Sequence, residues 1–201
     1  MRTAIALLLL VAGAGCMSTE REPLSKNYYT LDVPAGTVKC EKTVYDAAVY
    51  VAVPKTAALA DSRQIAARLP DGKRQNNFYH EFYASPAALV AGQLAARLRA
   101  DGIFLTVISE RPLPGIRYQL ESVITELGGD FRTPGKPLAV AEMQIFLTER
   151  GNPAFEPRVV FNCRKEVVLS GTASPVLVAG LNTALGQVFD ALEQELIQKG
   201  K

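Results

Sequence analysis

Residues 116–131 read IRYQLESVITELGGDF, a segment of mixed but alternating character between Tyr118 and Leu127. Such alternation is typical of a strand in a sheet that is covered on one face only. Two further long segments, 137–148 and 158–170, follow it along the chain. Glycine and proline separate the pieces, at Gly128-Gly129, Pro134-Gly135 and Gly151-Asn152-Pro153. The three segments predict an antiparallel meander.

Shorter segments of β character precede the meander. Two of them end at a proline, and two others flank the turn sequence Pro70-Asp71-Gly72-Lys73 and predict a hairpin. A last apolar run predicts a short buried strand. In chain order the five segments are Tyr28–Val33, Val44–Val53, Gln64–Leu69, Asn76–Tyr83 and Ile103–Ile108.

Two helices carry clear start signals. Ser85 is an N-cap candidate, Pro86 suits the first helical position, and Gly102 stands where a C-terminal cap belongs. The second start, Ser174 followed by Pro175, leads into apolar residues that recur every three or four positions. The order strands, helix, strands, helix predicts an α+β fold, a two-layer sandwich. We expect a mixed, mostly antiparallel sheet with two main amphipathic helices on one face.

The first sixteen residues predict a lipoprotein signal peptide. Arg2 provides a positive start, residues 4–11 are an apolar run too short to span a membrane, and three small residues lead into Cys16. Cleavage before Cys16 would leave a diacylglycerol on its thiol. The alternative is an ordinary signal peptide cleaved nearby, with Cys16 as a spare thiol. Met17, in place of the Asp that retains lipoproteins at the inner membrane, favours the outer membrane, facing the periplasm.

The domain boundaries follow from this start. We expect a signal peptide over residues 1–15, a lipidated polar tether over 16–26 and a single periplasmic domain over 27–201. The whole chain has 22 basic and 20 acidic side chains, and a nearly neutral surface argues against a nucleic-acid partner. In an oxidising compartment Cys40 and Cys163 are a candidate disulfide, and two separate buried thiols are the alternative.

Groups for catalysis are scarce. His80 is the only histidine, and its neighbour Glu81 would point to the opposite face of a strand. The sequence contains no Cys-x-x-Cys, no Gly-x-Ser-x-Gly and no glycine-rich phosphate loop. We therefore expect no enzyme, no metal site and no cofactor.

One segment is unusually aromatic. Phe78, Tyr79, Phe82 and Tyr83 fall within six residues, whereas the whole chain has eight phenylalanines and seven tyrosines. One interpretation packs the phenylalanines into the core and leaves the tyrosine hydroxyls in water. The other makes the segment a surface for a protein partner, because aromatic residues are enriched in interfaces. The four residues are our candidate partner surface.

The order of these features resembles the ABC-type transport auxiliary lipoproteins, the family of paraquat-inducible protein C. The motifs that carry the resemblance follow the lipoprotein signal, and a helix and a C-terminal amphipathic helix complete the order. They are Tyr28-Tyr29-Thr30-Leu31, Val51-Ala52-Val53-Pro54, Asp61-Ser62-Arg63-Gln64-Ile65 and the aromatic stretch from Phe78 to Tyr83.

The resemblance implies a non-enzymatic role in envelope lipid transport. The lipoprotein would be held at the outer membrane by its lipid and would dock a periplasm-spanning mammalian-cell-entry (MCE) domain protein of an ABC transporter. A ring-shaped homo-oligomer is one form of such a component. The alternatives are a regulator of peptidoglycan synthesis and a soluble lipid carrier. Synthase activators have long tethers, whereas about ten residues separate Cys16 from Asn27 here, too few to cross the peptidoglycan at ~3.5 Å each.

Overall fold

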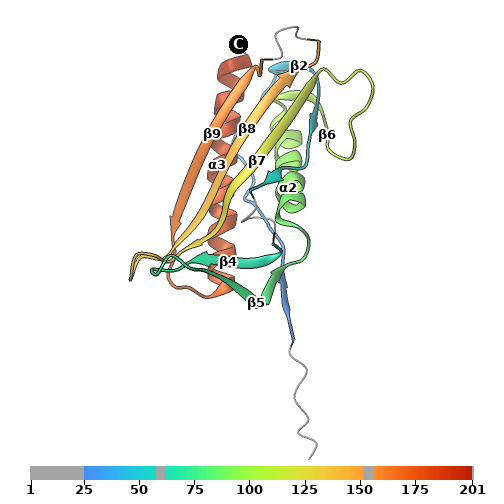
Figure 1. Cartoon of the computed structure of the whole chain (residues 1–201). Helices are drawn as coiled ribbons and strands as arrows, with labels where there is room; N and C mark the ends of the chain where they lie inside the picture. The colour runs from blue at the N-terminus through green and yellow to red at the C-terminus, as the bar shows by residue number, and fades with distance from the viewer. Residues whose placement is uncertain (1–24, 58–61, 152–155, 201) are drawn as a thin grey trace, which may run out of the picture.

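The meander expected from residues 116–131 and the two segments after it is the centre of the fold. In the computed structural model, β7 (Tyr118–Asp130), β8 (Leu138–Glu149) and β9 (Val159–Val168) pair antiparallel in sequence order. The three long strands form one layer in Figure 1. Side chains that face the helices are buried along β7, and this confirms a sheet covered on one face.

The remaining strands extend the same sheet with parallel pairings. The structure describes residues 25–57, 62–151 and 156–200. In these ranges β2, β3 and β4 each pair parallel with β7, β6 pairs parallel with β2, and β5 forms the expected hairpin with β4. β1 runs parallel to β5 at the edge. Their bounds are β1 Asn27–Tyr29, β2 Tyr45–Val51, β3 Lys55–Thr56, β4 Gln64–Arg68, β5 Arg74–Phe82 and β6 Phe104–Ile108.

Both helices cover one face of the sheet, and the α+β prediction is confirmed (Figure 1). α2 (Pro86–Asp101) packs on β6 and β2, and α3 (Ser174–Gly200) packs on β8 and β9. The Ser85 hydroxyl caps α2 by accepting from the Ala88 N–H, and Gly102 ends it with φ 72°. α3 is long and apolar enough to cross a membrane, but over half of its most apolar stretch is buried inside the protein.

An extended strap, residues 31–40, replaces most of the strand expected over Tyr28–Val33. β1 ends at Tyr29, and the strap then runs along the two helices. Side chains supply its backbone partners: the Asp32 N–H donates to Asn182 of α3, and the Val33 N–H donates to Gln93 of α2. The prediction was wrong here because alternating residues cannot reveal hydrogen bonds to side chains that lie far along the chain.

The predicted strand Ile103–Ile108 exists but is not buried as expected. Within the described ranges β6 pairs with β2 alone and lies at the edge of the sheet. Phe104 faces the core, whereas Leu105 is 63% exposed. An apolar run shows that a strand can form, but it cannot show whether a second strand will cover its far side.

Candidate functional site

A bulge in β5 displays the aromatic segment. Gln64 of β4 is opposite Glu81, and Ala66 is opposite Asn76, so that Ile65 alone faces residues 77–80 of β5. The Asn77 side chain accepts the Tyr79 N–H at 3.0 Å and donates to the Ser174 hydroxyl at 3.2 Å. These bonds hold the bulge against the first turn of α3. Bulges of this kind redirect side chains that a regular strand would alternate between two faces.

The bulge turns two neighbouring rings outward. Phe78 is 56% exposed and Tyr79 is 43% exposed, and their rings meet edge to face with centroids 5.3 Å apart. Tyr83 is 74% exposed, whereas Phe82 is 3% exposed and belongs to the core. Of the four residues of the candidate partner surface, Phe82 is therefore excluded. The other three lie on the surface, and the interpretation that buried both phenylalanines is wrong for Phe78.

Tyr28 was not among the expected surface residues but belongs with them. It is 55% exposed and is paired with Glu81 across the parallel β1–β5 ladder. The guanidinium of Arg63 lies 5.9 Å from the centre of its ring. The sequence signal was present in the Tyr28-Tyr29 pair, but only the β1–β5 pairing brings it beside the bulge. We call Tyr28, Phe78, Tyr79 and Tyr83 the aromatic end.

Polar neighbours of the aromatic end are paired with one another. The Lys26 ammonium lies 2.6 Å from Glu81 and 4.4 Å from the centre of the Phe78 ring. Arg63 is 3.7 Å from the same carboxylate. His80 Nδ1 hydrogen-bonds with the Tyr29 hydroxyl at 2.7 Å. His80 and Glu81 have separate partners and do not form an acid–base pair.

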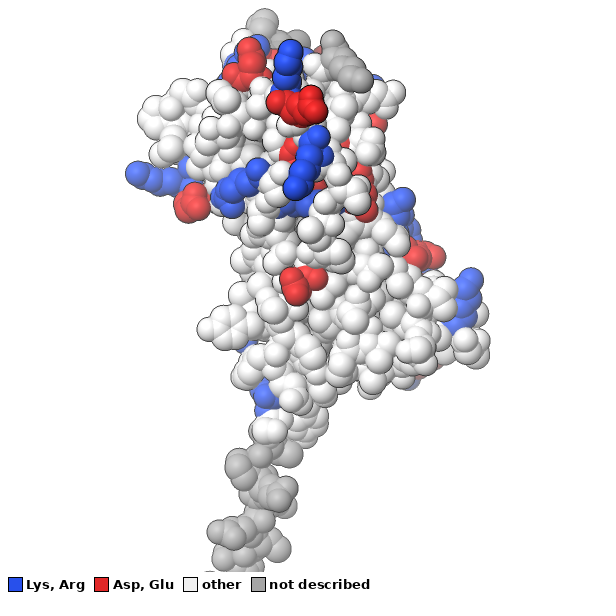
Figure 2. Space-filling model, turned by 180° about the vertical axis from the view of Figure 1, so that it is seen from behind, with Lys and Arg blue, Asp and Glu red and all other residues white. Residues whose placement is uncertain are grey.

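Charge is distributed unevenly over the helix side of the molecule. In Figure 2 side chains of both signs gather over the upper half, and the lower half carries few. The sequence explains this: α2 has no charged residue before Arg97, and α3 has none before Asp190. α2 follows β5 directly and α3 begins beside Asn77, so both uncharged halves lie near the aromatic end.

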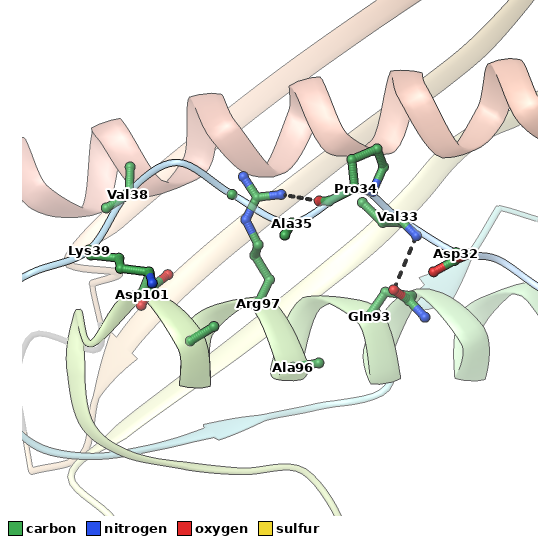
Figure 3. A pocket seen from close by; sticks show the side chains of 12 residues that line it. Asp32, Val33, Pro34, Ala35, Val38, Lys39, Gln93, Ala96, Arg97 and Asp101 are labelled. Carbon is green, nitrogen blue, oxygen red and sulfur yellow. Dashed lines mark hydrogen bonds between the residues drawn. The ribbon is translucent and has the colours of Figure 1, made fainter.

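A cavity of about 470 Å³ lies between the strap and α2 (Figure 3). Small and apolar residues, among them Val33, Ala35 and Ala96, form much of its wall. Arg97 lies beside it, with hydrogen bonds to the Pro34 carbonyl at 2.7 Å and to Glu193 at 2.5 Å, and with a further ion pair to Asp190. This arginine ties together the strap and both helices.

Asp101 lines the same cavity and is almost fully buried. One oxygen accepts the Ile103 N–H at 2.8 Å, and the other has no hydrogen-bond partner among the described residues. Burial raises the pKa of Asp101 from 3.8 to about 7. Asp32, Lys39 and Arg97 also line the cavity, but its lining, among the described residues, includes no serine, threonine, cysteine or histidine, so it presents no nucleophile paired with a base.

Cys40 and Cys163, the candidate disulfide, are both free thiols in the structure. Cys40 lies on the strap, where its N–H donates to the Asp101 carbonyl at the end of α2. Cys163 lies in β9 opposite Met143 and packs against the core. Burial raises the pKa of each thiol. The prediction of a disulfide rested only on the presence of two cysteines in an oxidising compartment. The sequence carries no information on the distance between the strap and β9.

The described residues contain no group of three or more His, Cys, Asp or Glu side chains that could hold a metal ion. Cys16 lies outside the described residues. The site with the most distinctive geometry is the aromatic end. Its rings are exposed, the charged side chains beside it are paired, and the adjoining halves of the two helices are uncharged.

Comparison with known proteins identifies relatives of this chain. A family model described as the ABC-type transport auxiliary lipoprotein component matches residues 29–193. A search of curated proteins found no match.

Solved structures show the same fold at low identity. A Xanthomonas campestris protein of family DUF330 superposes with a TM-score of 0.74 at 18% identity, covering 87% of this chain and 96% of that one. An uncharacterised protein gives 0.67 at 13% identity, with 86% and 99% covered. A hypothetical protein from Chlamydia trachomatis gives 0.50 at 9% identity, with 77% and 95% covered. At these identities the likeness establishes the fold alone.

Proposed function

Because this chain belongs to the ABC-type transport auxiliary lipoprotein family, we propose that it is the outer-membrane docking component of an envelope lipid-transport system. The family match, which extends over nearly all of the folded domain, is the observation that carries the proposal. Membership points to a membrane-anchored envelope location and to a transporter as partner. We further propose that the membrane is the outer membrane and that the partner is an MCE-domain protein.

Lipid on Cys16 provides the anchor in this proposal. Small residues precede the cysteine, and two or more acyl chains hold a protein stably on a membrane. Cells fed labelled palmitate should incorporate it into wild-type protein and not into Cys16→Ser, and gradient separation of the membranes should place the wild type with the outer membrane. Equal labelling of the two proteins refutes the anchor.

A docking role suits the chemistry of the described residues. The single histidine is bonded to Tyr29, and the buried charges of Arg97 and Glu193 neutralise each other inside the helix layer. By contrast, two surfaces are open to a partner. One is the aromatic end. The other is the face of β7–β9 away from the helices, where Val160 and Val168 are exposed and Arg164 binds three glutamates.

Capture of the partner tests the function. Lipidated protein extracted in mild detergent should retain the MCE-domain protein, and light scattering of the same sample reports whether the lipoprotein is a homo-oligomer. Two variants then locate the contact: Tyr79→Ala with Tyr83→Ala at the aromatic end, and Val160→Lys on the open sheet face. Truncation of an interface aromatic typically costs ~2 kcal/mol or more, a loss of over tenfold in affinity.

The same experiment distinguishes the proposed docking role from the rival function, regulation of peptidoglycan synthesis. A wild-type protein that captures no MCE-domain protein but stimulates a peptidoglycan synthase is a regulator of cell-wall synthesis, and the proposal then fails. The length of the tether opposes that outcome, because ten residues extend at most ~35 Å from the membrane.

A further inference from the structure

We propose that the aromatic end lies against the outer membrane and inserts its rings among the lipid headgroups, which makes it a second membrane contact beside the lipid anchor. This inference rests on the proposed anchor at Cys16. It assigns the aromatic end to lipid and leaves the open sheet face to the protein partner.

The aromatic end lies close to the proposed lipid anchor along the chain. The chain enters the described structure at Ser25, and Lys26 lies directly over the Phe78 ring. Nine residues separate Cys16 from Lys26, so the Phe78 ring is within ~35 Å of the anchored lipid even with the tether fully extended. Any shorter path of the tether brings the aromatic end to the bilayer surface first, because β1 and β5 lie at the end of the molecule where the chain enters (Figure 1).

The side chains of the aromatic end are of a kind that suits a membrane surface. Three of the four rings of the aromatic end are tyrosines, whose apolar bodies and polar hydroxyls suit the boundary between hydrocarbon and water. All four are at least two-fifths exposed. The chain leaves them in water in the isolated domain, although it buries Phe82 of the same segment.

The charges around the aromatic end also favour a membrane surface. Glu81 is held between Lys26 and Arg63, and among the described residues this cluster carries one more positive than negative charge beside the rings. The adjoining halves of α2 and α3, residues 86–96 and 174–189, contain no charged side chain. A surface that is uncharged apart from a slight positive excess can approach zwitterionic and anionic headgroups without the cost of desolvating carboxylates.

Shape favours lipid over a protein at this end. Aromatic hot spots of protein interfaces sit in well-packed central pockets. The cavities along the strap and behind β4 are lined by other residues, and none of the four rings of the aromatic end contributes to either. The rings project around a three-residue edge strand, with Phe78 and Tyr79 in edge-to-face contact, an arrangement that a fluid headgroup layer can surround.

The chain has no tryptophan, so a single Tyr→Trp change creates a unique fluorescent reporter. Tyr83→Trp and Tyr28→Trp mark the aromatic end. Leu105→Trp is the matched control, because the exposed fraction of Leu105, 63%, lies between those of Tyr28 and Tyr83. Leu105 lies on β6, which pairs with β2 beside Tyr45, and the Tyr45 hydroxyl donates to the Leu196 carbonyl near the far end of α3. Each lipidated protein is reconstituted into vesicles of phosphatidylethanolamine and phosphatidylglycerol, with and without brominated acyl chains.

We expect the emission of Tyr83→Trp and Tyr28→Trp to shift to shorter wavelength in vesicles and to lose most of its intensity with brominated lipid. Leu105→Trp should show neither change. Unquenched emission at both aromatic-end reporters in palmitate-labelled protein overturns this inference and leaves the anchor intact. If the emission shifts only when the MCE-domain protein is added, the aromatic end contacts the protein partner, and the proposed membrane contact is overturned. Loss of the palmitate label itself refutes the anchor, and a thermal melt close to wild type shows that each reporter protein is folded.

Discussion

At the scale of single residues, Gly36 and Arg97 show how the strap is held. A Cβ at Gly36 would run into the Arg97 guanidinium, whose position is set by Glu193, Asp190 and the Pro34 carbonyl. The arginine cannot yield without disrupting a buried ion pair, and a buried charge that has lost its partner is costly. The absence of a side chain at position 36 is therefore a condition for the strap to close over the helices.

Gly36→Ala should accordingly destabilise the protein by ~1–3 kcal/mol, the usual cost of overpacking. Gly186→Ala is the control. Gly186 lies in α3 and faces the same strap, where a Cβ meets Pro34 at an ordinary 3.5 Å and adds helix propensity. Urea denaturation of both variants measures the difference. Equal stability of the two would show that Arg97 moves freely, contrary to the contacts described.

Asp101 predicts a pH dependence of stability. Its pKa rises to about 7 in the folded protein from 3.8, so the folded state binds this proton more tightly than the unfolded chain. The stability that Asp101 contributes is therefore complete below about pH 4 and falls as the pH rises to about 7. Asp101→Asn keeps an acceptor for the Ile103 N–H but cannot ionise.

Between about pH 5 and about pH 8 we expect Asp101→Asn to gain ~1–3 kcal/mol in free energy of unfolding relative to wild type, at ~1.4 kcal/mol per unit of pKa shift. Denaturant titrations of both proteins at the two pH values give the difference directly. Glu193, whose charge contributes to the raised pKa of Asp101, is present in both proteins. A difference that does not vary with pH would place the pKa of Asp101 near its ordinary value.

Among elements, the two helices place glycine in opposite surroundings. Gly92 of α2 faces open space, whereas a Cβ at Gly180 of α3 would lie 2.8 Å from Ala139 and would collide with Leu169. Gly92 has no packing role, and its flexibility weakens the helix. Gly180 allows α3 to approach β8 closely.

We predict that Gly92→Ala stabilises the protein by ~0.5–1 kcal/mol through helix propensity. Gly180→Ala should destabilise it by ~1–3 kcal/mol despite the same gain in propensity, because the core is overpacked. Thermal melts of the pair test this, and a stabilised Gly180→Ala would mean that α3 does not pack on β8 as described.

Elements with local signals could be predicted, and elements with long-range partners could not. The caps at Ser85 and Gly102 lie beside the helix they end, and the turn at Pro70-Asp71-Gly72-Lys73 joins neighbouring strands, so both were visible in the sequence. The parallel insertion of β2 and β4 beside β7 joins segments far apart in the chain, and no periodicity encodes it. Likewise, the bulge that exposes Phe78 arises from a register shift against Ile65, which an alternating pattern does not show.

At the scale of the whole molecule, the three cysteines allow the proposed anchor and the free thiols of the folded chain to be tested together. A lipidated Cys16 has no thiol to react, and the structure leaves Cys40 and Cys163 free on the strap and on β9. Burial raises the pKa of both thiols, which disfavours the thiolates that attack disulfides. The two half-buried thiols should therefore persist in an oxidising compartment.

Mass spectrometry after alkylation of the unfolded, unreduced protein counts the thiols. For wild type we expect two alkylated sites, Cys40 and Cys163, and the same two in Cys16→Ser, because the serine variant loses the lipid but gains no thiol. A bridge between Cys40 and Cys163 would instead leave a lipidated wild type with none, and an ordinary signal peptidase product that keeps Cys16 would show three. Because each state gives its own count, one measurement tests both the proposed anchor and the free thiols of the structure.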